Sequence, residues 1–491
     1  MTKGTTVALL RDTAQAVPDG EAFVDGTTRL TFGAWDRAAD GLATALADRG
    51  VGRGDVVALL LPSSADYATC YAAAMRLGAI TTGINLRLGP AEVASIVERT
   101  RPALAVVDDG IELPAGVPAV LRRSDLVALY GLDPPSSRPR LDPSDPVAVV
   151  WTSGTTGVPK GAVFDHANLR DMAPGAGALS ADGDRRLSPL PFAHVGYMTR
   201  MWDELVHRIT TVITPTPWKA GGALRLIEEE RVTVGQGVPT QWALMLTDPT
   251  LSTTDVSSLR LASTGAARVP AELVREMRER LGCPVVVRYA STEASLITGT
   301  RLGDPDEVVA ETVGRASEGV ELRLVGEGGG PVGAGDVGMV QCRSGAAMRG
   351  YWEDPERTAE VLDPEGWVST GDLGWLGDDG NLRLVGRRTE MYVRGGYNVY
   401  PAEVEAVLGE HPAVDRAAVV GLPAPVLGDV GWAFVVPAPG TTVDPDELRA
   451  WCRSRLADYK APDHVRVVDD LPLTSMLKVD KRALAVLVAA S

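Results

Sequence analysis

The chain has 491 residues, 45% of them hydrophobic and 23% charged, which is typical of a folded globular protein and too long for one ordinary core. Its formal net charge of -16 argues against nucleic acid or an anionic membrane as the main partner. No stretch approaches the roughly 18 consecutive apolar residues of a membrane span, so we expect no transmembrane segment.

The cysteines lie far apart in the sequence, without metal-ligand spacing, at Cys70, Cys283, Cys342 and Cys452. This pattern predicts reduced and mostly packed thiols. The first six residues lack the apolar core of a signal peptide. We therefore expect a cytoplasmic protein.

Strands and helices alternate along the first part of the chain. A short strand at 29–32 leads into a helix whose apolar positions Ala38, Leu42 and Leu46 have helical spacing, and a strand at 55–61 follows. The alternation continues with a helix at 67–77 and recurs near 211–290. The pattern predicts an α/β protein with two doubly wound subdomains side by side.

The character of the sequence changes after residue 319. Short alternating strands rich in glycine predict a small β-barrel-like unit over 319–385. From about residue 390 strands and helices mix, which predicts a small α+β domain. We expect an N-terminal domain over 1–386, a junction at 387–389 and a C-terminal domain over 390–491.

A run rich in hydroxyls and glycines follows the apolar, strand-like stretch 146–151. It reads Thr152-Ser153-Gly154-Thr155-Thr156-Gly157-Val158-Pro159-Lys160-Gly161. Glycines let backbone N–H groups converge on an anion, and the lysine adds a mobile positive charge. The Walker pattern is absent. The run predicts a polyphosphate-binding loop; the alternative, a surface turn, is disfavoured because a strand leads directly into it.

Five further segments carry residue types suited to a nucleotide and an acid. They contain His194 after a strand, Gly265-Ala266-Ala267 after the strand 259–264, Tyr289 to Glu293, Asp372 in a tight turn, and Lys478 near the C-terminus. Each has a structural alternative. His194 taken alone is a core histidine, Glu293 a helix-start carboxylate and Lys478 a solvated lysine.

In this order and spacing, the segments resemble the adenylate-forming superfamily of acyl-CoA synthetases, nonribosomal-peptide adenylation domains and luciferases. The resemblance covers essentially the whole chain. The stretch 343–404 is the most specific part, with Arg349-Gly350-Tyr351-Trp352, Thr370-Gly371-Asp372, Gly386-Arg387 and Gly395-Gly396-Tyr397-Asn398.

The resemblance implies that a carboxylate attacks the α-phosphate of ATP to give acyl-AMP. The residues it implies for the β- and γ-phosphates are Thr152, Ser153, Gly154, Thr155, Thr156, Gly157 and Lys160. Tyr289 would lie against the adenine, with Gly265 and Ala266 on the other side. Thr292 would contact the α-phosphate and Glu293 would hold Mg²⁺.

The remaining implied roles concern the ribose, the acid and the thiol. Asp372 would bind the ribose hydroxyls with help from Arg387. His194 would lie near the substrate carboxylate, and Lys478 would bridge this carboxylate and the α-phosphate. In the second step CoA attacks the acyl-AMP after the C-terminal domain rotates about Thr389. Gly395 and Gly396 would then line the pantetheine tunnel.

The chain departs from the family pattern at three positions. Ala290, in the nucleotide-binding segment, replaces a glycine, and its methyl would crowd the pocket. Leu477, preceded by Met476, replaces the glycine before Lys478, and Thr389 stands where Asp or Lys is usual. Two of the three departures lie next to the adenylation residues, so the formation of acyl-AMP is the half-reaction that the resemblance supports least.

The expected enzyme is an ATP-dependent, AMP-forming acid–CoA ligase that uses ATP, Mg²⁺ and CoA. Three alternatives stay open: a specialist in thioester formation from supplied acyl-AMP, a ligase that loads a carrier-protein phosphopantetheine, and a noncatalytic acyl-nucleotide binder. The segment 193–197 contains no acid to hold an ammonium, which disfavours an amino-acid substrate. Aryl, medium-chain and polycyclic acids all fit, and the sequence predicts no oligomeric state.

Overall fold

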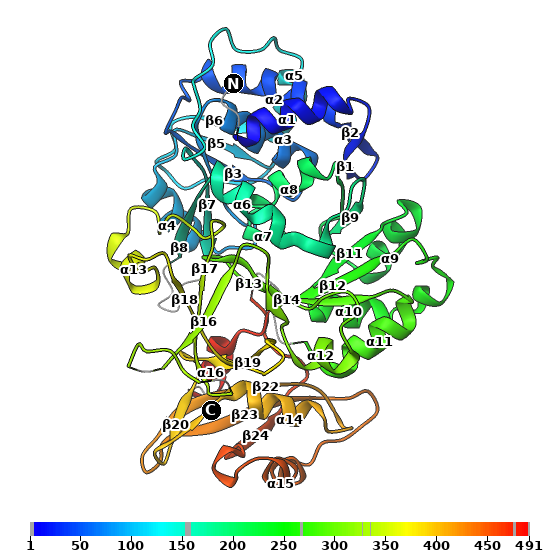
Figure 1. Ribbon diagram of the computed structural model, residues 1–491, viewed down its shortest axis with the longest axis vertical. Coiled ribbons are helices and arrows are strands. Elements are labelled where there is room, and N and C mark those ends of the chain that lie inside the picture. Colours follow the sequence, from blue (N-terminus) through cyan, green and yellow to red (C-terminus); the bar gives the residue numbers. More distant parts are fainter. Residues whose placement is uncertain are drawn as a thin grey trace. The chain divides into compact units, whose positions relative to one another are not determined.

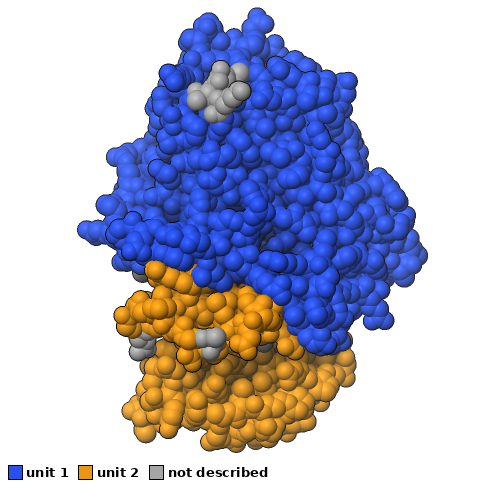
Figure 2. All heavy atoms as spheres, viewed as in Figure 1, with its two compact units in different colours: residues 1–310, 314–322, 342–368 blue, residues 311–313, 323–341, 369–491 orange. Residues whose placement is uncertain are grey.

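The computed structural model describes residues 4–152, 159–265, 269–326, 328–333, 335–474 and 478–489. The chain divides into two compact units, which Figure 2 colours separately. The first unit comprises residues 1–310, 314–322 and 342–368, and the second comprises 311–313, 323–341 and 369–491.

One sheet of the first unit consists of β3 (Val56–Leu60), β4 (Ile80–Gly83), β5 (Leu104–Val107), β6 (Val120–Arg122), β7 (Pro146–Thr152) and β8 (Lys160–Asp165). Its order is β6-β5-β3-β4-β7-β8. Neighbouring strands are parallel except for the antiparallel hairpin of β7 and β8.

Helices cover both faces of this sheet. The helices of this region are α1 (Thr6–Ala16), α2 (Phe32–Ala47), α3 (Ala65–Arg76), α4 (Pro90–Thr100) and the short α5 (Leu126–Leu129). Successive residues of a strand point to opposite faces. Accordingly, Val57 and Leu59 of β3 belong to the core formed with α2 and α3, whereas Val56, Ala58 and Leu60 pack in the core that contains residues of α4. The sheet is therefore doubly wound.

The second sheet of the first unit contains β1 (Glu21–Asp25), β2 (Thr28–Thr31), β9 (Arg185–Ser188), β10 (Thr210–Ile213), β11 (Val234–Gly237), β12 (Leu261–Gly265), β13 (Val285–Ser291), β14 (Ser295–Gly299) and β15 (Arg315–Ala316). Its order is β15-β14-β13-β12-β11-β9-β10-β1-β2, parallel from β13 to β1 and antiparallel at both edges. Figure 1 shows the blue strands β1 and β2 beside strands from much later in the chain.

The helices that accompany these later strands are α6 (His166–Ala176), α7 (Val195–Met198), α8 (Met201–Val206), α9 (Ala220–Glu229), α10 (Pro239–Thr247), α11 (Ala271–Leu281), α12 (Asp306–Glu311) and α13 (Pro355–Val361). Short 3-10 helices lie at Arg123–Asp125, Gly177–Leu179, Pro249–Thr253 and Asp458–Lys460.

The four-stranded sheet β16-β17-β18-β19, most of which belongs to the second unit, is formed by β16 (Glu321–Val325), β17 (Gly338–Arg343), β18 (Val368–Leu376) and β19 (Leu382–Arg387). A further sheet contains β20 (Tyr392–Arg394), β21 (Tyr397–Val399), β22 (Val414–Ala424), β23 (Gly428–Pro437) and β24 (His464–Val467). Its helices are α14 (Pro401–Gly409), α15 (Pro445–Arg455) and α16 (Lys481–Ala489). The long β22–β23 hairpin packs against α14, and α14 also contacts β19.

The predicted fold class is confirmed: parallel sheets with helices on their faces precede a β-rich segment and a small α+β segment. All four cysteines are buried and free, as expected. In the described ranges, no helix is long and apolar enough to cross a membrane. The second unit extends on both sides of residues 387–389, so the division into units does not test the expected junction, which stays a prediction.

Candidate functional site

The predicted phosphate loop joins β7 to β8. Thr152 and Lys160 are register partners in this hairpin, so the first and last residues of the loop lie side by side. Ser153, Gly154, Thr155, Thr156 and Gly157 lie outside the described residues. The structure therefore places the base of the loop and its lysine.

Tyr351 connects two of the predicted site residues. Its hydroxyl donates a hydrogen bond of 2.7 Å to Oε1 of Glu293, and Nζ of Lys160 lies over its ring, 5.2 Å from the centroid. Burial, and then the neighbouring Glu293 carboxylate, raise the pKa of Tyr351 above its usual value, so the hydroxyl stays a donor. Tyr351 thus holds the candidate metal ligand beside the candidate phosphate lysine.

Glu293 lies in the turn that joins β13 to β14 and does not begin a helix. Its backbone carbonyl accepts a hydrogen bond of 2.8 Å from the N–H of Met348, which fixes the turn against the segment that leads to Tyr351. Thr292 is in the same turn and partly exposed. The alternative of a helix-start carboxylate at Glu293 is therefore wrong.

Tyr289 and Gly265 lie on adjacent parallel strands. Gly265 of β12 pairs with Arg288 of β13, and a Cβ at Gly265 would collide with the carbonyl oxygen of Arg288, so only glycine fits. Tyr289 is buried, whereas Ala290 is exposed and follows a register shift in the β13–β14 pairing. Ala266 lies outside the described residues.

His194 is held by an asparagine that the motifs did not single out. Nδ2 of Asn85 lies 2.8 Å from Nε2 of His194, and Oδ1 of Asn85 accepts a hydrogen bond of 3.0 Å from the N–H of Arg87. Because the amide nitrogen only donates, Nε2 of His194 accepts this hydrogen bond. Asn85 follows β4, and its place after the carboxyl end of a parallel strand is the signal that points to it.

Two predicted residues pair in the second unit, and a third, Lys478, responds to their charges. Asp372 and Arg387 are register partners across β18 and β19, and Nε of Arg387 lies 3.3 Å from Oδ1 of Asp372. The pKa of Lys478 is lowered, mainly by burial and then by the positive charge of Arg387, while the Asp372 carboxylate opposes the shift. Lys478 is thus within electrostatic reach of both side chains. Met476 and Leu477 lie outside the described residues.

The remaining predicted residues lie in exposed turns of the second unit. Gly395 and Gly396 form the tip of the β20–β21 hairpin, with φ angles of 58° and 87°, and the N–H of Gly395 donates to the carbonyl of Leu427. Thr389 lies in the turn after β19, where the N–H of Glu390 donates to the carbonyl of Arg387.

The predicted metal ligand is a single carboxylate, that of Glu293. Among the residues that the structure describes, no group of three or more His, Cys, Asp or Glu side chains is arranged to hold a metal ion. Mg²⁺ is commonly bound by one or two carboxylates together with substrate phosphates. Glu293, next to the end of the phosphate loop, supplies one such carboxylate.

Comparison with protein families assigns both parts of the chain. The model of the AMP-binding enzyme matches residues 10–352, and the model of the AMP-binding enzyme C-terminal domain matches residues 403–478. The chain belongs to the AMP-binding enzyme family. The predicted membership of the adenylate-forming superfamily is thereby confirmed.

Full-length relatives of this AMP-binding enzyme are CoA ligases. It is 34% identical to the 3-[(3aS,4S,7aS)-7a-methyl-1,5-dioxo-octahydro-1H-inden-4-yl]propanoyl:CoA ligase of Rhodococcus jostii, over 98% of both chains. It is 36% identical to the feruloyl-CoA synthase of Amycolatopsis sp, over 95% of this chain and 96% of that one. The predicted class of enzyme, an ATP-dependent, AMP-forming acyl-CoA synthetase, is confirmed.

A solved structure of similar fold belongs to an enzyme that forms an amide bond. The amide bond synthetase McbA from Marinactinospora thermotolerans superposes with a TM-score of 0.89 at 30% identity, over 98% of this chain and 99% of that one. Family and fold therefore do not determine whether a thiol or an amine accepts the acyl group.

Proposed function

We propose that this AMP-binding enzyme is an acid–CoA ligase for ring-bearing carboxylic acids. It forms acyl-AMP from ATP and the acid, and it then transfers the acyl group to the thiol of CoA. The observation that carries the proposal is the ion pair of Arg387 with Asp372 across β18 and β19.

In the first step a carboxylate oxygen attacks the α-phosphorus of ATP, and the bond to pyrophosphate breaks. Both reactants are anions, so positive charge and positioning dominate the catalysis. Lys160 and Lys478 supply that charge at the phosphates and at the reacting carboxylate, and Thr292 contacts the α-phosphate. Glu293 would hold Mg²⁺, which neutralises charge on the phosphate oxygens when it is bound.

The nucleoside is held by groups from strands and turns. Tyr289 lies against the adenine, and Gly265 permits close approach on the other side. Asp372 accepts hydrogen bonds from the ribose hydroxyls, and Arg387, 3.3 Å from it, orients that carboxylate.

In the second step the thiol sulfur attacks the acyl carbonyl, the thioester forms and AMP leaves. Gly395 and Gly396 line the path of the pantetheine, where the lack of a Cβ leaves room. Both glycines are exposed. The turn at 387–389, which contains Thr389, is the hinge that exchanges the two catalytic arrangements.

The class of acid is supported by the relatives and by the segment after β9. The names of the relatives contain an octahydro-indenyl propanoyl and a feruloyl group, both ring-bearing. Gly196 is exposed, and a Cβ there would meet only Leu190 among the described residues, at 4.0 Å. His194, oriented by Asn85, lies at the start of the same helix, next to the expected place of the substrate carboxylate.

The similarity to McbA favours an amine as a second candidate acceptor. Mass spectrometry of reactions with ATP, Mg²⁺ and a panel of arylpropanoic, cinnamic and polycyclic acids separates the two, with CoA or a primary amine as acceptor. We expect an ATP-dependent acyl-CoA product. An amide without thioester would overturn the choice of acceptor.

Supplied acyl-AMP resolves a negative panel. If thioester forms from acyl-AMP and CoA but never from ATP and acid, the chain is the half-reaction specialist. If neither route gives a thioester with CoA, a phosphopantetheinylated carrier protein is tested as the thiol, and failure there contradicts the ligase proposal. Lys478→Ala serves as the internal control: it should reduce adenylation by about 10²- to 10³-fold.

A further inference from the structure

The backbone of Lys478 is fixed by the segment that precedes it. Leu473 and Val479 form an antiparallel bridge, the N–H of Thr474 donates to the carbonyl of Lys478 at 2.7 Å, and the N–H of Asp480 donates to the carbonyl of Pro472 at 2.7 Å. These bonds join 472–474 to 478–480 as a pair of segments around one isolated β-bridge. The position of Lys478 therefore depends on what anchors this pair.

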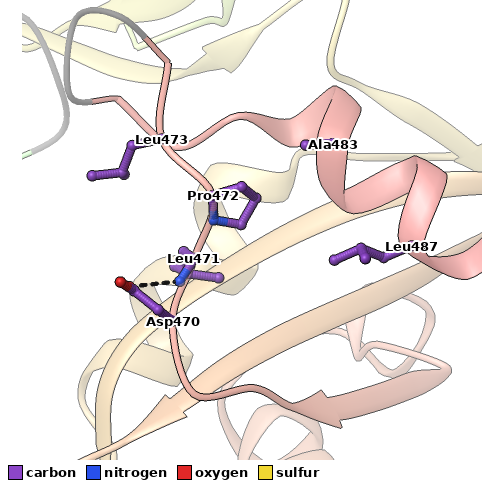
Figure 3. Close-up of a pocket in the computed structure, with 6 residues that line it drawn as sticks. All are labelled: Asp470, Leu471, Pro472, Leu473, Ala483 and Leu487. Carbon is purple, nitrogen blue, oxygen red and sulfur yellow. Dashed lines mark hydrogen bonds between the residues drawn. The ribbon is translucent and has the colours of Figure 1, made fainter.

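One anchor is the start of α16. Oδ1 of Asp480 accepts hydrogen bonds of 3.1 Å from the N–H groups of Arg482 and Ala483 and so caps the helix. Figure 3 shows Leu471 and Pro472 near Ala483 and Leu487 of α16, around a shallow pocket of about 530 Å³. The pair and the helix thus form one local body.

A second anchor is the side chain of Lys481, three residues after Lys478. Its Nζ lies 2.7 Å from Oε2 of Glu390 and 2.8 Å from Oε1 of Glu405. Glu390 ends the turn whose first residue is Arg387, with a backbone hydrogen bond of 3.1 Å between them. Glu405 of α14 also accepts a hydrogen bond of 2.8 Å from the N–H of Val419 in β22. Lys481 therefore ties α16 to α14 and to the turn after β19.

The three charged groups are shielded enough for the ion pairs to matter. The exposed fractions of the side chains of Lys481, Glu390 and Glu405 are 24%, 36% and 18%. Burial alone would lower the pKa of Lys481, but the two carboxylates outweigh it and raise the pKa, so the ammonium is charged at neutral pH. Without that ammonium, two carboxylates would face each other unpaired.

A backbone hydrogen bond from Glu390 to Arg387 and the ion pair of Glu390 with Lys481 thus connect Arg387 to the segment that contains Lys478. We propose that Lys481 is a positioning residue for adenylate formation, because its bridge to Glu390 and Glu405 ties the start of α16, and with it the backbone of Lys478, to α14 and to the turn that begins at Arg387. The inference rests on the proposed function. It predicts a defect confined to the half-reaction that uses Lys478.

The test is Lys481→Met in the full-length enzyme, with each half-reaction measured alone. Pyrophosphate release from ATP and acid reports adenylation, and thioester from supplied acyl-AMP and CoA reports acyl transfer. We expect kcat for adenylation to fall about 10- to 100-fold, as expected for a displaced catalytic group, with KM for ATP and the rate of acyl transfer little changed. Lys481→Arg keeps the charge and should restore most of the rate.

The control and a second variant separate positioning from stability. Arg453→Met removes an exposed ion pair with Asp458 on the same unit and should leave both half-reactions unchanged. If Lys481→Met lowers the folding yield, Glu390→Gln is tested in its place. In that variant Lys481 keeps its ion pair with Glu405 and loses only the ion pair with the turn. A selective decrease in adenylation is expected for this variant too.

Three results would overturn the inference: unchanged adenylation in Lys481→Met, an equal loss in both half-reactions, or no recovery in Lys481→Arg. Failure of the proposed function gives a different result, because the unmodified enzyme would then form no acyl-AMP from any acid.

Discussion

At the scale of single residues, Tyr351 links the candidate metal ligand to the phosphate loop. Its hydroxyl orients Glu293 at 2.7 Å and its ring lies under Lys160. Groups that orient a metal ligand without touching the metal commonly change metal affinity or activity 10- to 100-fold when removed. Tyr351 is therefore the clearest target for testing whether Glu293 holds the ion.

We predict that Tyr351→Phe raises the Mg²⁺ concentration needed for half-maximal adenylation by about tenfold, because Glu293 loses the donor that orients it while the ring under Lys160 remains. The measurement is pyrophosphate release at increasing Mg²⁺ and saturating ATP.

The matched control is Tyr130→Phe, which removes a comparable hydrogen bond of 2.6 Å from a tyrosine to Asp66 in the same unit. It should leave the Mg²⁺ titration unchanged. An unchanged titration in Tyr351→Phe, or an equal shift in both variants, would contradict the role given to Glu293.

The sequence predicted the residues on the motifs but not the pairs between them. Lys160 and Glu293 stand out because their local patterns are specific. Tyr351 was visible in the run Arg349-Gly350-Tyr351-Trp352, yet its partner Glu293 is 58 residues away, and Asn85 is 109 residues from His194. Such contacts are set by tertiary packing, which no local pattern encodes.

At the scale of elements, the tip of the β20–β21 hairpin is the predicted site of the second half-reaction alone. Gly396 has a φ of 87°, and a Cβ there would meet no described atom within 4 Å. A side chain at this position costs about 1–2 kcal/mol in backbone strain and projects a methyl where the pantetheine is expected to pass.

We predict that Gly396→Ala slows thioester formation from supplied acyl-AMP and CoA by about tenfold and leaves pyrophosphate release unchanged. Gly440→Ala is the control, because Gly440 has a φ of 77°, open surroundings and a place in the same unit. Equal effects of the two substitutions would show that strain alone is responsible.

Asp203 and Glu204 of helix α8 form a buried charge cluster with Arg186 and Arg200. Oδ2 of Asp203 lies 2.6 Å from Nη2 of Arg200 and 3.3 Å from Nη2 of Arg186, and Oε1 of Glu204 lies 3.7 Å from Nη1 of Arg186. Burial raises the pKa of Glu204 from 4.5 to about 7, against the opposing pull of Arg186 and Arg200. The folded state therefore binds the Glu204 proton more tightly than the unfolded state does.

This difference has a defined sign. The contribution of protonated Glu204 to the free energy of unfolding is complete below pH 4.5. It is lost as the pH rises to about 7, and the loss is about 3 kcal/mol if Glu204 alone changes. We predict that Glu204→Gln flattens the decrease in the urea midpoint between pH 5 and 8. Asp203→Asn should instead lower the midpoint at pH 7, because Arg186 and Arg200 lose their carboxylate. A slope like that of the unmodified protein in Glu204→Gln would contradict the assignment.

The sequence predicted the regular elements well where hydrophobic period and turn residues agree, as in β3, α2 and α3. It missed that Glu293 lies in a β-hairpin, because hydroxyl residues followed by an acidic residue also occur at the start of helices. The pairing of β13 with β14 decides between the two, and it depends on register partners such as Tyr289 and Thr298.

At the scale of the whole molecule, the doubly wound architecture was predictable because strand–helix alternation leaves few topologies. The division into units was not. Composition changes near residue 386, but α14 contacts β19 and a Cβ at Gly386 would lie 3.7 Å from side-chain atoms of Tyr400 and Ala402, so the second unit continues across that point. Contacts in space define a compact unit, and composition does not report them.

A double variant of the whole enzyme tests whether Tyr351 and Gly396 act on successive steps. Tyr351→Phe is expected to slow adenylation and Gly396→Ala to slow acyl transfer. For sequential steps on one enzyme the times of the steps add, so the double variant should make acyl-CoA at saturating substrates about as slowly as the sum of the two delays predicts.

If both substitutions disturbed one shared step, their effects would multiply instead, since independent losses in one barrier add as free energies. Two tenfold losses would then give about a hundredfold decrease, against about twentyfold for sequential steps. Steady-state acyl-CoA formation by the two single variants and the double variant at limited Mg²⁺ distinguishes these outcomes. A multiplicative result would contradict the assignment of Tyr351 and Gly396 to separate half-reactions.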